Sequence, residues 1–302
     1  MEYPLAPLPR VGLIGFGAMG SAMARNLQAR GYALTVRDIR QEAQQQAADA
    51  GMAVALSPAT LAANVDLVAI VVVNAAQIAE VLYGTPDCPG LLEGSRPGQM
   101  VLLCSTIAPE DAIGFAARLS ESGLVVIDAP VSGGPARALS GEMSMMLAGP
   151  QAALDSMAAL LGDLAQSRFH LGHQVGDAAK AKLVNNLLAG INLAAGAEAL
   201  ALGIRLGLEP QKIFHIISAS SGNSWIFQDR MGRAIQHDFA PRAAVPVLTK
   251  DLGLAVALAA TVQAATPLGC VAHAQFQETL ASGWAALDDA AILKTYLHNN
   301  KA

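Results

Sequence analysis

Charged and aromatic residues are scarce in this sequence of 302 residues, at only 14% and 4% of the chain. The 19 lysines and arginines are outnumbered by 24 aspartates and glutamates, which gives a formal net charge of -5, and no basic cluster occurs. A nucleic-acid-binding protein needs a basic patch to contact phosphates. The composition therefore argues against a nucleic-acid partner and favours small-molecule partners.

Cysteine and histidine are also few. Cys88, Cys104 and Cys270 are far apart and form no CxxC pair, so neither a disulfide framework nor a zinc site is predicted. The six histidines show no metal-ligand spacing, so we expect no metal. The first ten residues contain no basic stretch followed by an apolar run, which a secretory signal requires. We therefore expect a cytoplasmic protein.

Hydrophobic residues, by contrast, make up 53% of the chain, and the mean hydropathy is +0.40. The strongest candidate for a membrane-spanning segment is 252–277, because no formal charge appears between Asp251 and Glu278. Its length would suffice to span a membrane. Pro267 would break a helix near the middle of this segment. We therefore predict two buried helices there, and no membrane partner.

The first half of the chain alternates short apolar strands with helical stretches, which is typical of a parallel-rich sheet covered by helices. After about residue 172 the strand signals stop, and long Ala/Leu-rich helical segments begin with 176–206. We predict an α/β Rossmann-type domain over 1–172, followed by an all-α domain over 173–302. The expected strands are Val11–Ile14, Ala33–Val36, Leu67–Val73, Val101–Cys104, Leu124–Ile127, Met143–Leu147 and a weaker Arg168–Leu171.

A GxGxxG motif follows the first expected strand and precedes a helical stretch expected over Ser21–Arg30. In a dinucleotide-binding turn, Gly15 permits the tight turn, Gly17 lets the backbone approach a pyrophosphate, and Gly20 lets the helix pack on the sheet. A purely structural glycine turn is the alternative. The strand and helix on either side favour dinucleotide binding by the loop, which comprises Gly15, Phe16, Gly17, Ala18, Met19 and Gly20.

Asp38 lies 18 positions after Gly20, at the end of the second expected strand. A carboxylate at this position can accept a hydrogen bond from the 2′-hydroxyl of an adenine ribose and would repel a 2′-phosphate. Arg37 and Arg40 flank it and would offset part of that repulsion. The pattern therefore favours NAD over NADP.

Two further loops, at Asn74 and Thr106, follow apolar strands. Ligands of open parallel sheets bind outside the carboxyl ends of the strands, so both residues are candidates to contact the cofactor. Ordinary helix capping by Asn and Ser/Thr is an equally good interpretation.

The segment Asp128–Gly134 ends another strand with a serine and two glycines. Ser132, Gly133 and Gly134 offer a hydroxyl and accessible backbone amides that can hold a carboxylate. A plain turn explains the same residues. Ser132 has no GxSxG elbow around it, which argues against a nucleophile.

Lys182 and Asn186 are i,i+4 neighbours on one face of the first long helix of the second domain. A lysine that is removed from water can exchange a proton with a substrate hydroxyl, and an amide four residues on can orient that hydroxyl. The alternative is a lysine whose side chain reaches solvent.

Lys250 and Asp251 form a second pair of charges, which we expect at the start of an apolar helix. An acid in the first turn suits the helix dipole, and Lys250 is a candidate contact for cofactor or substrate. A capped helix start without a ligand role is the alternative.

Four motifs together resemble the β-hydroxyacid dehydrogenase family, which includes 3-hydroxyisobutyrate dehydrogenase. They occur in the order and spacing of the family and span nearly the whole chain. The motifs are GLIGFGAMGSAMARNL at 12–27, DAPVSGG at 128–134, KLVNN at 182–186 and KDLGLA at 250–255.

This resemblance implies a role for each motif. Lys182 would be the catalytic acid/base, with Asn186 assisting it. The loop at Ser132–Gly134 would bind the substrate carboxylate, and Thr106 and Lys250 would line the cofactor site. The resemblance also implies a homodimer or homotetramer.

Several further stretches resemble the L-threonate dehydrogenase subgroup, whose members use NAD to oxidise the C2 hydroxyl of a four-carbon sugar acid to a 2-oxo acid. A 3-hydroxyisobutyrate dehydrogenase or a tartronate semialdehyde reductase is the alternative. The stretch SGNSWIFQDR is expected to line the substrate pocket, and it is the feature that distinguishes these activities from L-threonate oxidation. A non-catalytic dinucleotide sensor would not need Lys182. The stretches are VVNAAQ (72–77), STIA (105–108), GEMSMM (141–146), LLAGINLAAGAEALAL (187–202) and SGNSWIFQDR (221–230).

Overall fold

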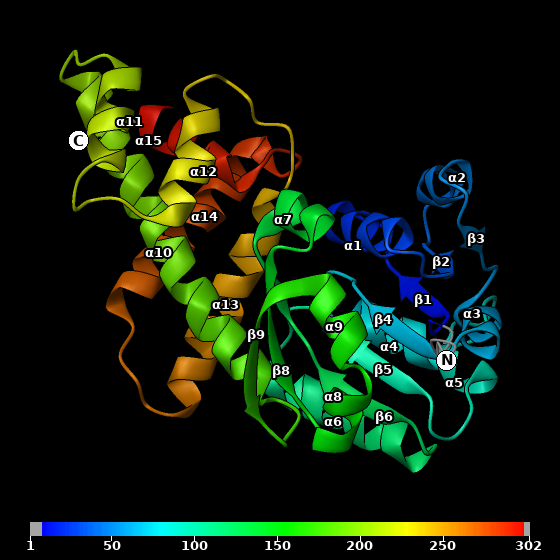
Figure 1. Cartoon of the computed structure of the whole chain (residues 1–302). Coiled ribbons are helices and arrows are strands. Elements are labelled where there is room, and N and C mark those ends of the chain that lie inside the picture. The colour runs from blue at the N-terminus through cyan, green and yellow to red at the C-terminus, as the bar shows by residue number, and fades with distance from the viewer. Residues whose placement is uncertain (1–7, 299–302) are drawn as a thin grey trace, which may run out of the picture. The chain divides into compact units, whose positions relative to one another are not determined.

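The structure is a computed structural model that describes residues 8–298 of the chain. It divides into two compact units, the first ending at Lys182 and the second beginning at Leu183. The long helix α10 (Asp177–Arg205) contributes to both, because its first residues fall in unit 1 and the rest in unit 2. Figure 1 shows the order of the elements along the chain.

Unit 1 is built on a sheet that has nine strands within the described residues, in the order β3-β2-β1-β4-β5-β6-β8-β7, with β9 paired to β8. The strands from β3 to β6 are all parallel, whereas β8 runs antiparallel to β6 and β7. The strand order reverses direction between β1 and β4, and ligands of such sheets bind at this point. The strands are β1 (Val11–Ile14), β2 (Leu34–Arg37), β3 (Ala53–Val54), β4 (Leu67–Ile70), β5 (Met100–Leu103), β6 (Val125–Asp128), β7 (Val131–Ser132), β8 (Met143–Ala148) and β9 (Ala165–Gly172).

Helices cover both faces of this sheet, because successive residues of each parallel strand point to opposite sides. In β1, Leu13 packs into a core with α1, α2, α7, α8 and α9, while Ile14 packs into a second core with α3, α4, α5 and α6. The helices of unit 1 are α1 (Ala18–Ala29), α2 (Gln41–Asp49), α3 (Pro58–Asn64), α4 (Ala75–Tyr83), α5 (Leu91–Gly94), α6 (Pro109–Glu121), α7 (Gly134–Ser140), α8 (Gln151–Ser156) and α9 (Ala158–Leu164).

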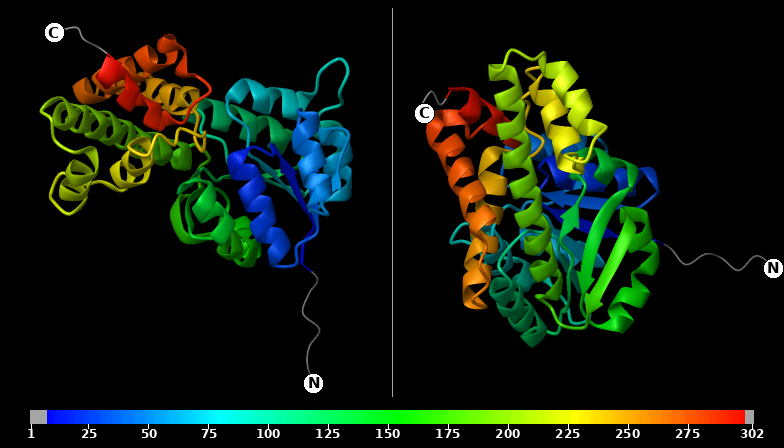
Figure 2. Two further views of the ribbon diagram at one scale, coloured as in Figure 1. Left: turned by 90° about the horizontal axis from the view of Figure 1, so that it is seen from above. Right: turned by 90° about the vertical axis from the view of Figure 1, so that its left-hand side faces the viewer.

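Unit 2 is helical and packs around α10, the long green helix of Figure 2. Leu193, Ala197 and Leu200 on α10 are fully buried in its core. Helix α10 is long and apolar enough to cross a membrane, but the core helix of a soluble protein passes the same test. The other elements are α11 (Pro210–Ser218), α12 (Trp225–Ala234), α13 (Val245–Thr261), α14 (Pro267–Thr279), a π-helical turn (Leu280–Trp284), a 3₁₀ turn (Asp289–Ala291) and α15 (Ile292–His298).

The predicted fold class, a Rossmann-type domain followed by a helical domain, is confirmed, but some local predictions are wrong. Helix α1 begins at Ala18 rather than Ser21, so Gly20 lies inside its first turn. Helix α13 begins at Val245, where Pro246 suits a first turn, so Lys250 and Asp251 lie within the helix and not at its start.

The segment 252–277 forms parts of two helices, as predicted, with Pro267 at the start of α14. The expectation that both are buried is only partly correct. Leu268 and Val271 on α14 are 68% and 61% exposed, because α14 packs only one face against its neighbours.

Candidate functional site

The glycine-rich turn lies between β1 and α1, at the carboxyl edge of the sheet. Gly15 has a φ of +98°, and a Cβ there would lie 2.3 Å from the Val71 carbonyl oxygen. A Cβ at Gly20 would lie 1.9 Å from the Gly15 carbonyl oxygen, so this glycine brings α1 against the turn. A Cβ at Gly17 would meet nothing within 4 Å. The outer side of the turn is therefore open, as a pyrophosphate lying against the backbone at the start of α1 requires.

Asp38 follows β2 and is held against this turn. Its Oδ2 accepts a hydrogen bond from the Phe16 amide at 2.7 Å, and its Oδ1 accepts one from the Arg40 amide at 2.9 Å. Burial alone would raise the pKa of Asp38, but the hydrogen bonds from Arg40 and Phe16 outweigh it and lower that pKa below its usual value. Asp38 is therefore an ionised carboxylate next to the turn, which suits an adenine ribose.

The loops after β4 and β5 are tied to each other. The Ser105 hydroxyl accepts a hydrogen bond from the Val72 amide at 3.0 Å. Asn74 caps α4, since its Oδ1 accepts a hydrogen bond from the Gln77 amide at 2.9 Å. Thr106 does not cap α6, which begins at Pro109 after Ala108. The capping interpretation therefore describes Asn74 in this structure but not Thr106.

The serine–glycine segment follows β6. Ser132 ends β7 and pairs with Ser144 of β8, which fixes its backbone. Gly133 and Gly134 have φ values of +128° and +75°, in the region that favours glycine. A Cβ at Gly134 would meet nothing within 4 Å, so its backbone is open to a ligand.

Asp128, the last residue of β6, was not among the residues that the sequence singled out. It is only 2% exposed, and its Oδ2 accepts hydrogen bonds from the amides of Gly176 and Ala179, each at 2.9 Å. The carboxylate therefore caps the start of α10. In the sequence, the available signal was an aspartate directly after the apolar run Leu124–Ile127.

Lys182 lies one turn further along α10 and is 7% exposed, so its side chain does not reach into solvent in the way that most helical lysines do. Four residues on, Asn186 is 8% exposed and its Nδ2 donates to Asp251 Oδ2 at 2.7 Å. The other Asp251 oxygen accepts from Lys250 Nζ at 2.6 Å. The structure thus links two residues of the KLVNN and KDLGLA motifs through a buried carboxylate.

The SGNSWIFQDR stretch divides into two parts. Its first part, with Asn192, Ala195, Gly196 and Ala199 of α10, lines a pocket of about 390 Å³ within unit 2. Its last residue, Arg230, is buried, and Arg230 Nε donates to Asp289 Oδ1 at 2.6 Å. The role of the stretch in binding substrate stays a prediction.

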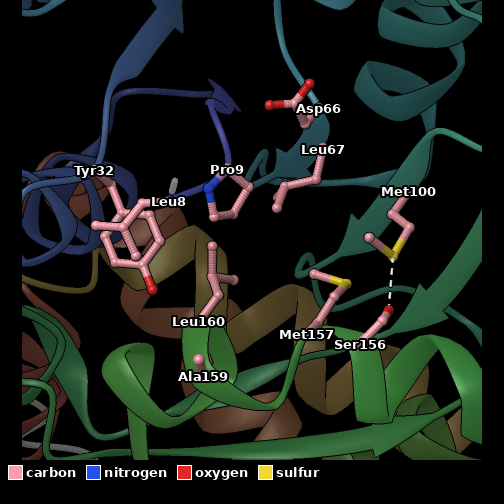
Figure 3. Close-up of a pocket in the computed structure, with 10 residues that line it drawn as sticks. All are labelled: Leu8, Pro9, Tyr32, Asp66, Leu67, Met100, Ser156, Met157, Ala159 and Leu160. Carbon is pink, nitrogen blue, oxygen red and sulfur yellow. Dashed lines mark hydrogen bonds between the residues drawn. The ribbon is translucent and has the colours of Figure 1, made fainter. Parts of the chain in front are cut away.

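A second pocket, of about 220 Å³, lies in unit 1 at the opposite edge of the sheet, where β4 and β5 begin with Leu67 and Met100 (Figure 3). Its walls are mostly apolar, and none of the predicted site residues lines it. Among residues 8–298, no three His, Cys, Asp or Glu side chains come together to hold a metal ion.

The strand order, the open glycine-rich turn at the point where that order reverses, and the ionised Asp38 beside it define a dinucleotide-binding protein. Residues 10–172 match the family model described as the NAD binding domain of 6-phosphogluconate dehydrogenase. Residues 176–296 match the one described as NAD-binding of NADP-dependent 3-hydroxyisobutyrate dehydrogenase.

Individual relatives cover nearly the whole chain. L-threonate dehydrogenase from Cupriavidus necator is 40% identical over 286 residues, or 95% of each chain. NAD-dependent L-serine dehydrogenase from Pseudomonas aeruginosa is 35% identical over 96% of this chain and 98% of its own. The crystal structure of a 3-hydroxyisobutyrate dehydrogenase from Salmonella typhimurium superposes with a TM-score of 0.88 at 34% identity, covering 94% of this chain and 99% of the other.

The chain belongs to the β-hydroxyacid dehydrogenase family, which includes 3-hydroxyisobutyrate dehydrogenase. It is an NAD-dependent hydroxyacid dehydrogenase. The predicted family, enzyme class and cofactor are confirmed.

Proposed function

We propose that this dehydrogenase oxidises the C2 hydroxyl of L-threonate, or of a closely related small sugar acid, to a 2-oxo acid. The observation that carries the proposal is the 40% identity to L-threonate dehydrogenase over 95% of both chains. The buried Lys182, in the predicted position for an acid/base, supports the chemistry.

In this proposal the substrate carboxylate binds to Ser132, Gly133 and Gly134. The space beside the Gly134 backbone is free for a ligand. Lys182 Nζ accepts the proton of the C2 hydroxyl. Asn186, whose amide group is fixed by Asp251, orients that hydroxyl. A bound nicotinamide would supply the acceptor for the hydride that leaves C2. The products are then the 2-oxo acid, the reduced cofactor and one proton on the lysine.

We propose that the cofactor lies along the turn of Gly15, Phe16, Gly17, Ala18, Met19 and Gly20, with its adenine ribose on Asp38. The open space at Gly17 and the ionised Asp38 support this placement and a preference for NAD over NADP. Asn74, Thr106 and Lys250 are proposed cofactor contacts. Because the Asn74 and Lys250 side chains already have partners within the protein, their contacts would use their remaining hydrogen-bonding capacity or their backbone.

We also propose that the functional boundary falls at 172/173, where the first family match ends, and that the enzyme is a cytoplasmic homodimer or homotetramer. The exposed apolar side chains of Val184, Leu188, Leu268 and Val271 in unit 2 support an oligomer, since such side chains favour burial at an interface. Light scattering of the purified protein would give the subunit number.

The test is the initial rate of NADH formation from L-threonate and NAD, followed by absorbance. Lys182→Ala should abolish turnover while NAD binding, measured by calorimetry, survives. Lys180→Ala is the matched control, because Lys180 lies on the same helix and forms an exposed ion pair with Asp177. It should turn over like the wild type.

Unimpaired turnover in Lys182→Ala would overturn the role of this lysine. No rate with L-threonate, but a rate with 3-hydroxyisobutyrate, would favour the second candidate, for which the Salmonella structure is named. Tartronate semialdehyde with NADH should be tried in the reverse direction for the same reason.

A further inference from the structure

Asp128 joins two segments of unit 1 that are distant in sequence. It is the last residue of β6, and the amides that it accepts from, Gly176 and Ala179, lie 48 and 51 residues away. Ala178 also contributes a backbone hydrogen bond. One carboxylate therefore fixes the start of α10 to the carboxyl edge of the sheet.

The contact satisfies two requirements at once. The first amides of a helix have no partner within the helix, and the helix dipole favours a negative charge at that end. A buried carboxylate in turn needs hydrogen bonds to replace those of water. The Asp128 carboxylate and the first amides of α10 are both buried, so water cannot replace their hydrogen bonds when the contact is broken.

Both sides of the contact lead directly to residues of the proposed active site. On the helix side, Lys182 follows Ala179 by three residues, a rise of about 4.5 Å along the axis. On the sheet side, only Ala129 and Pro130 separate Asp128 from β7, which ends in Ser132. A shift at Asp128 would therefore change the distance between the loop proposed to hold the substrate and the proposed acid/base.

We propose that Asp128 is a positioning residue for this dehydrogenase: its ionised carboxylate holds the first turn of α10, and with it Lys182, in register with the loop at Ser132–Gly134. The proposal rests on the proposed role of Lys182. Asp128 acts through the helix and contacts neither substrate nor cofactor.

The ionisation of Asp128 makes this role dependent on pH. Burial raises the pKa of Asp128 to about 6, opposed by the hydrogen bonds from Ala179, Gly176 and Ala178. Two titratable groups interact electrostatically with Asp128: Asp177 on α10, which raises that pKa further, and the thiol of Cys104 after β5. Burial raises the pKa of Cys104 to about 12, so this thiol stays neutral while Asp128 titrates.

Protonation of Asp128 should loosen the start of α10 without unfolding the protein. A folded-state pKa of about 6, above the ordinary 3.8, means that the folded protein binds this proton more readily than the unfolded chain. This group therefore makes folding more favourable as the pH falls from 6 to 4, and less favourable as it rises. We therefore expect a local loss of activity at pH 5, since protonation of Asp128 does not itself favour unfolding.

The test compares wild type with Asp128→Asn, which keeps the shape of the side chain and removes its charge at every pH. At pH 8 the variant should lose kcat on the order of tenfold to a hundredfold, the scale expected for a misplaced catalytic group. Its KM for NAD should change little. The fall in wild-type kcat through pH 6 should be absent from the variant.

Amide hydrogen exchange gives a readout that does not depend on activity. After correction for intrinsic rates, Gly176 and Ala179 should exchange faster in Asp128→Asn at pH 8 than in wild type, and faster in wild type at pH 5 than at pH 8. The wild-type comparison holds even when the variant does not fold. Asp177→Asn is the matched control: it should keep kcat at pH 8 and move the acid limb to lower pH.

Wild-type kcat and an unchanged acid limb in Asp128→Asn would overturn the proposal. So would exchange at Gly176 and Ala179 that is the same in both proteins and at both pH values. Turnover that persists in Lys182→Ala would instead refute the proposed function, while the exchange data would still report whether Asp128 holds α10.

Discussion

Alanine at Gly17 and alanine at Gly20 should damage the protein in different ways, although both glycines belong to the same turn. A Cβ at Gly20 would lie 1.9 Å from the Gly15 carbonyl oxygen and 3.1 Å from Leu13 Cδ2. Contacts below 3.0 Å essentially never occur for a real Cβ, so the backbone of the turn would have to move by more than about 1 Å. Such overpacking costs about 1–3 kcal/mol or more, against a gain of about 1 kcal/mol from replacing a helical glycine.

Gly17 has the opposite balance. Nothing lies within 4 Å of its Cβ position, and its φ of −77° and ψ of −165° are open to alanine. We expect Gly17→Ala to change the free energy of unfolding by less than about 1 kcal/mol. Gly17 is the N-cap residue of α1 and makes no side-chain hydrogen bond to the helix, so alanine removes no such bond. The added methyl group would occupy the space through which a pyrophosphate approaches the backbone. Loss of one charge-assisted hydrogen bond, at about 1.5–3 kcal/mol, would weaken NAD binding by roughly tenfold to a hundredfold.

Urea unfolding of the apo-protein and calorimetric titration with NAD separate the two effects. Gly114→Ala is the control for the replacement itself, because Gly114 lies in α6 with open space around its Cβ, and this variant should be neutral or slightly stabilised. Wild-type affinity for NAD in Gly17→Ala would refute the placement of the pyrophosphate. Wild-type stability in Gly20→Ala would refute the steric argument.

Two further predictions concern carboxylates of unit 1. Asp38→Ser should raise the ratio of kcat/KM with NADP to kcat/KM with NAD by tenfold or more. The substitution removes the charge that repels a 2′-phosphate and leaves Arg40 nearby. An unchanged ratio would contradict the role of Asp38 in cofactor preference. Asp66→Asn should lower stability by less than about 1 kcal/mol at pH 7, since the ion pairs of Asp66 with Arg10 and Arg96 are partly exposed. Hydrogen bonds from Arg10 lower the pKa of Asp66 to about 2. The contribution of Asp66 to folding stability is therefore fully present above pH 4 and is lost as the pH falls through 2. Urea unfolding should show a smaller stability difference between wild type and Asp66→Asn at pH 3 than at pH 7.

The parts of the fold that sequence predicted are those set by local pattern. The expected strand at Val11–Ile14 has the same bounds in the structure, and the other strong strands differ by a few residues at their ends. The short strands β3 and β7 were not predicted, because two residues carry no periodicity and pair only where a neighbouring strand lies. The start of α13 was placed too late because the charges of Lys250 and Asp251 looked like a helix start, whereas Pro246 was the better signal.

The candidate site could be predicted as a set of residues but not as a set of contacts. Spacing alone put Lys182 and Asn186 on one face of a helix, and the structure shows both to be buried. Spacing did not reveal that Asp251, interpreted as an acid that favours a helix start, is the residue that holds the Asn186 amide. That contact joins positions 65 residues apart, and no local pattern reports it.

The buried carboxylates Asp128 and Asp251 differ in the groups that hold them, and this difference suits them to different roles. Asp251 faces an ammonium group, Lys250 Nζ at 2.6 Å, and the amide of Asn186, so its charge is balanced by a side chain. For Asp128, the hydrogen bonds come from backbone amides, and burial is the largest influence on its pKa. Burial disfavours the charged form of a carboxylate, and at Asp128 this effect outweighs the hydrogen bonds from the backbone amides, which act in the opposite direction. Asp251 is therefore suited to fix the Asn186 side chain, whereas the raised pKa of Asp128 suits it to make the placement of α10 depend on pH.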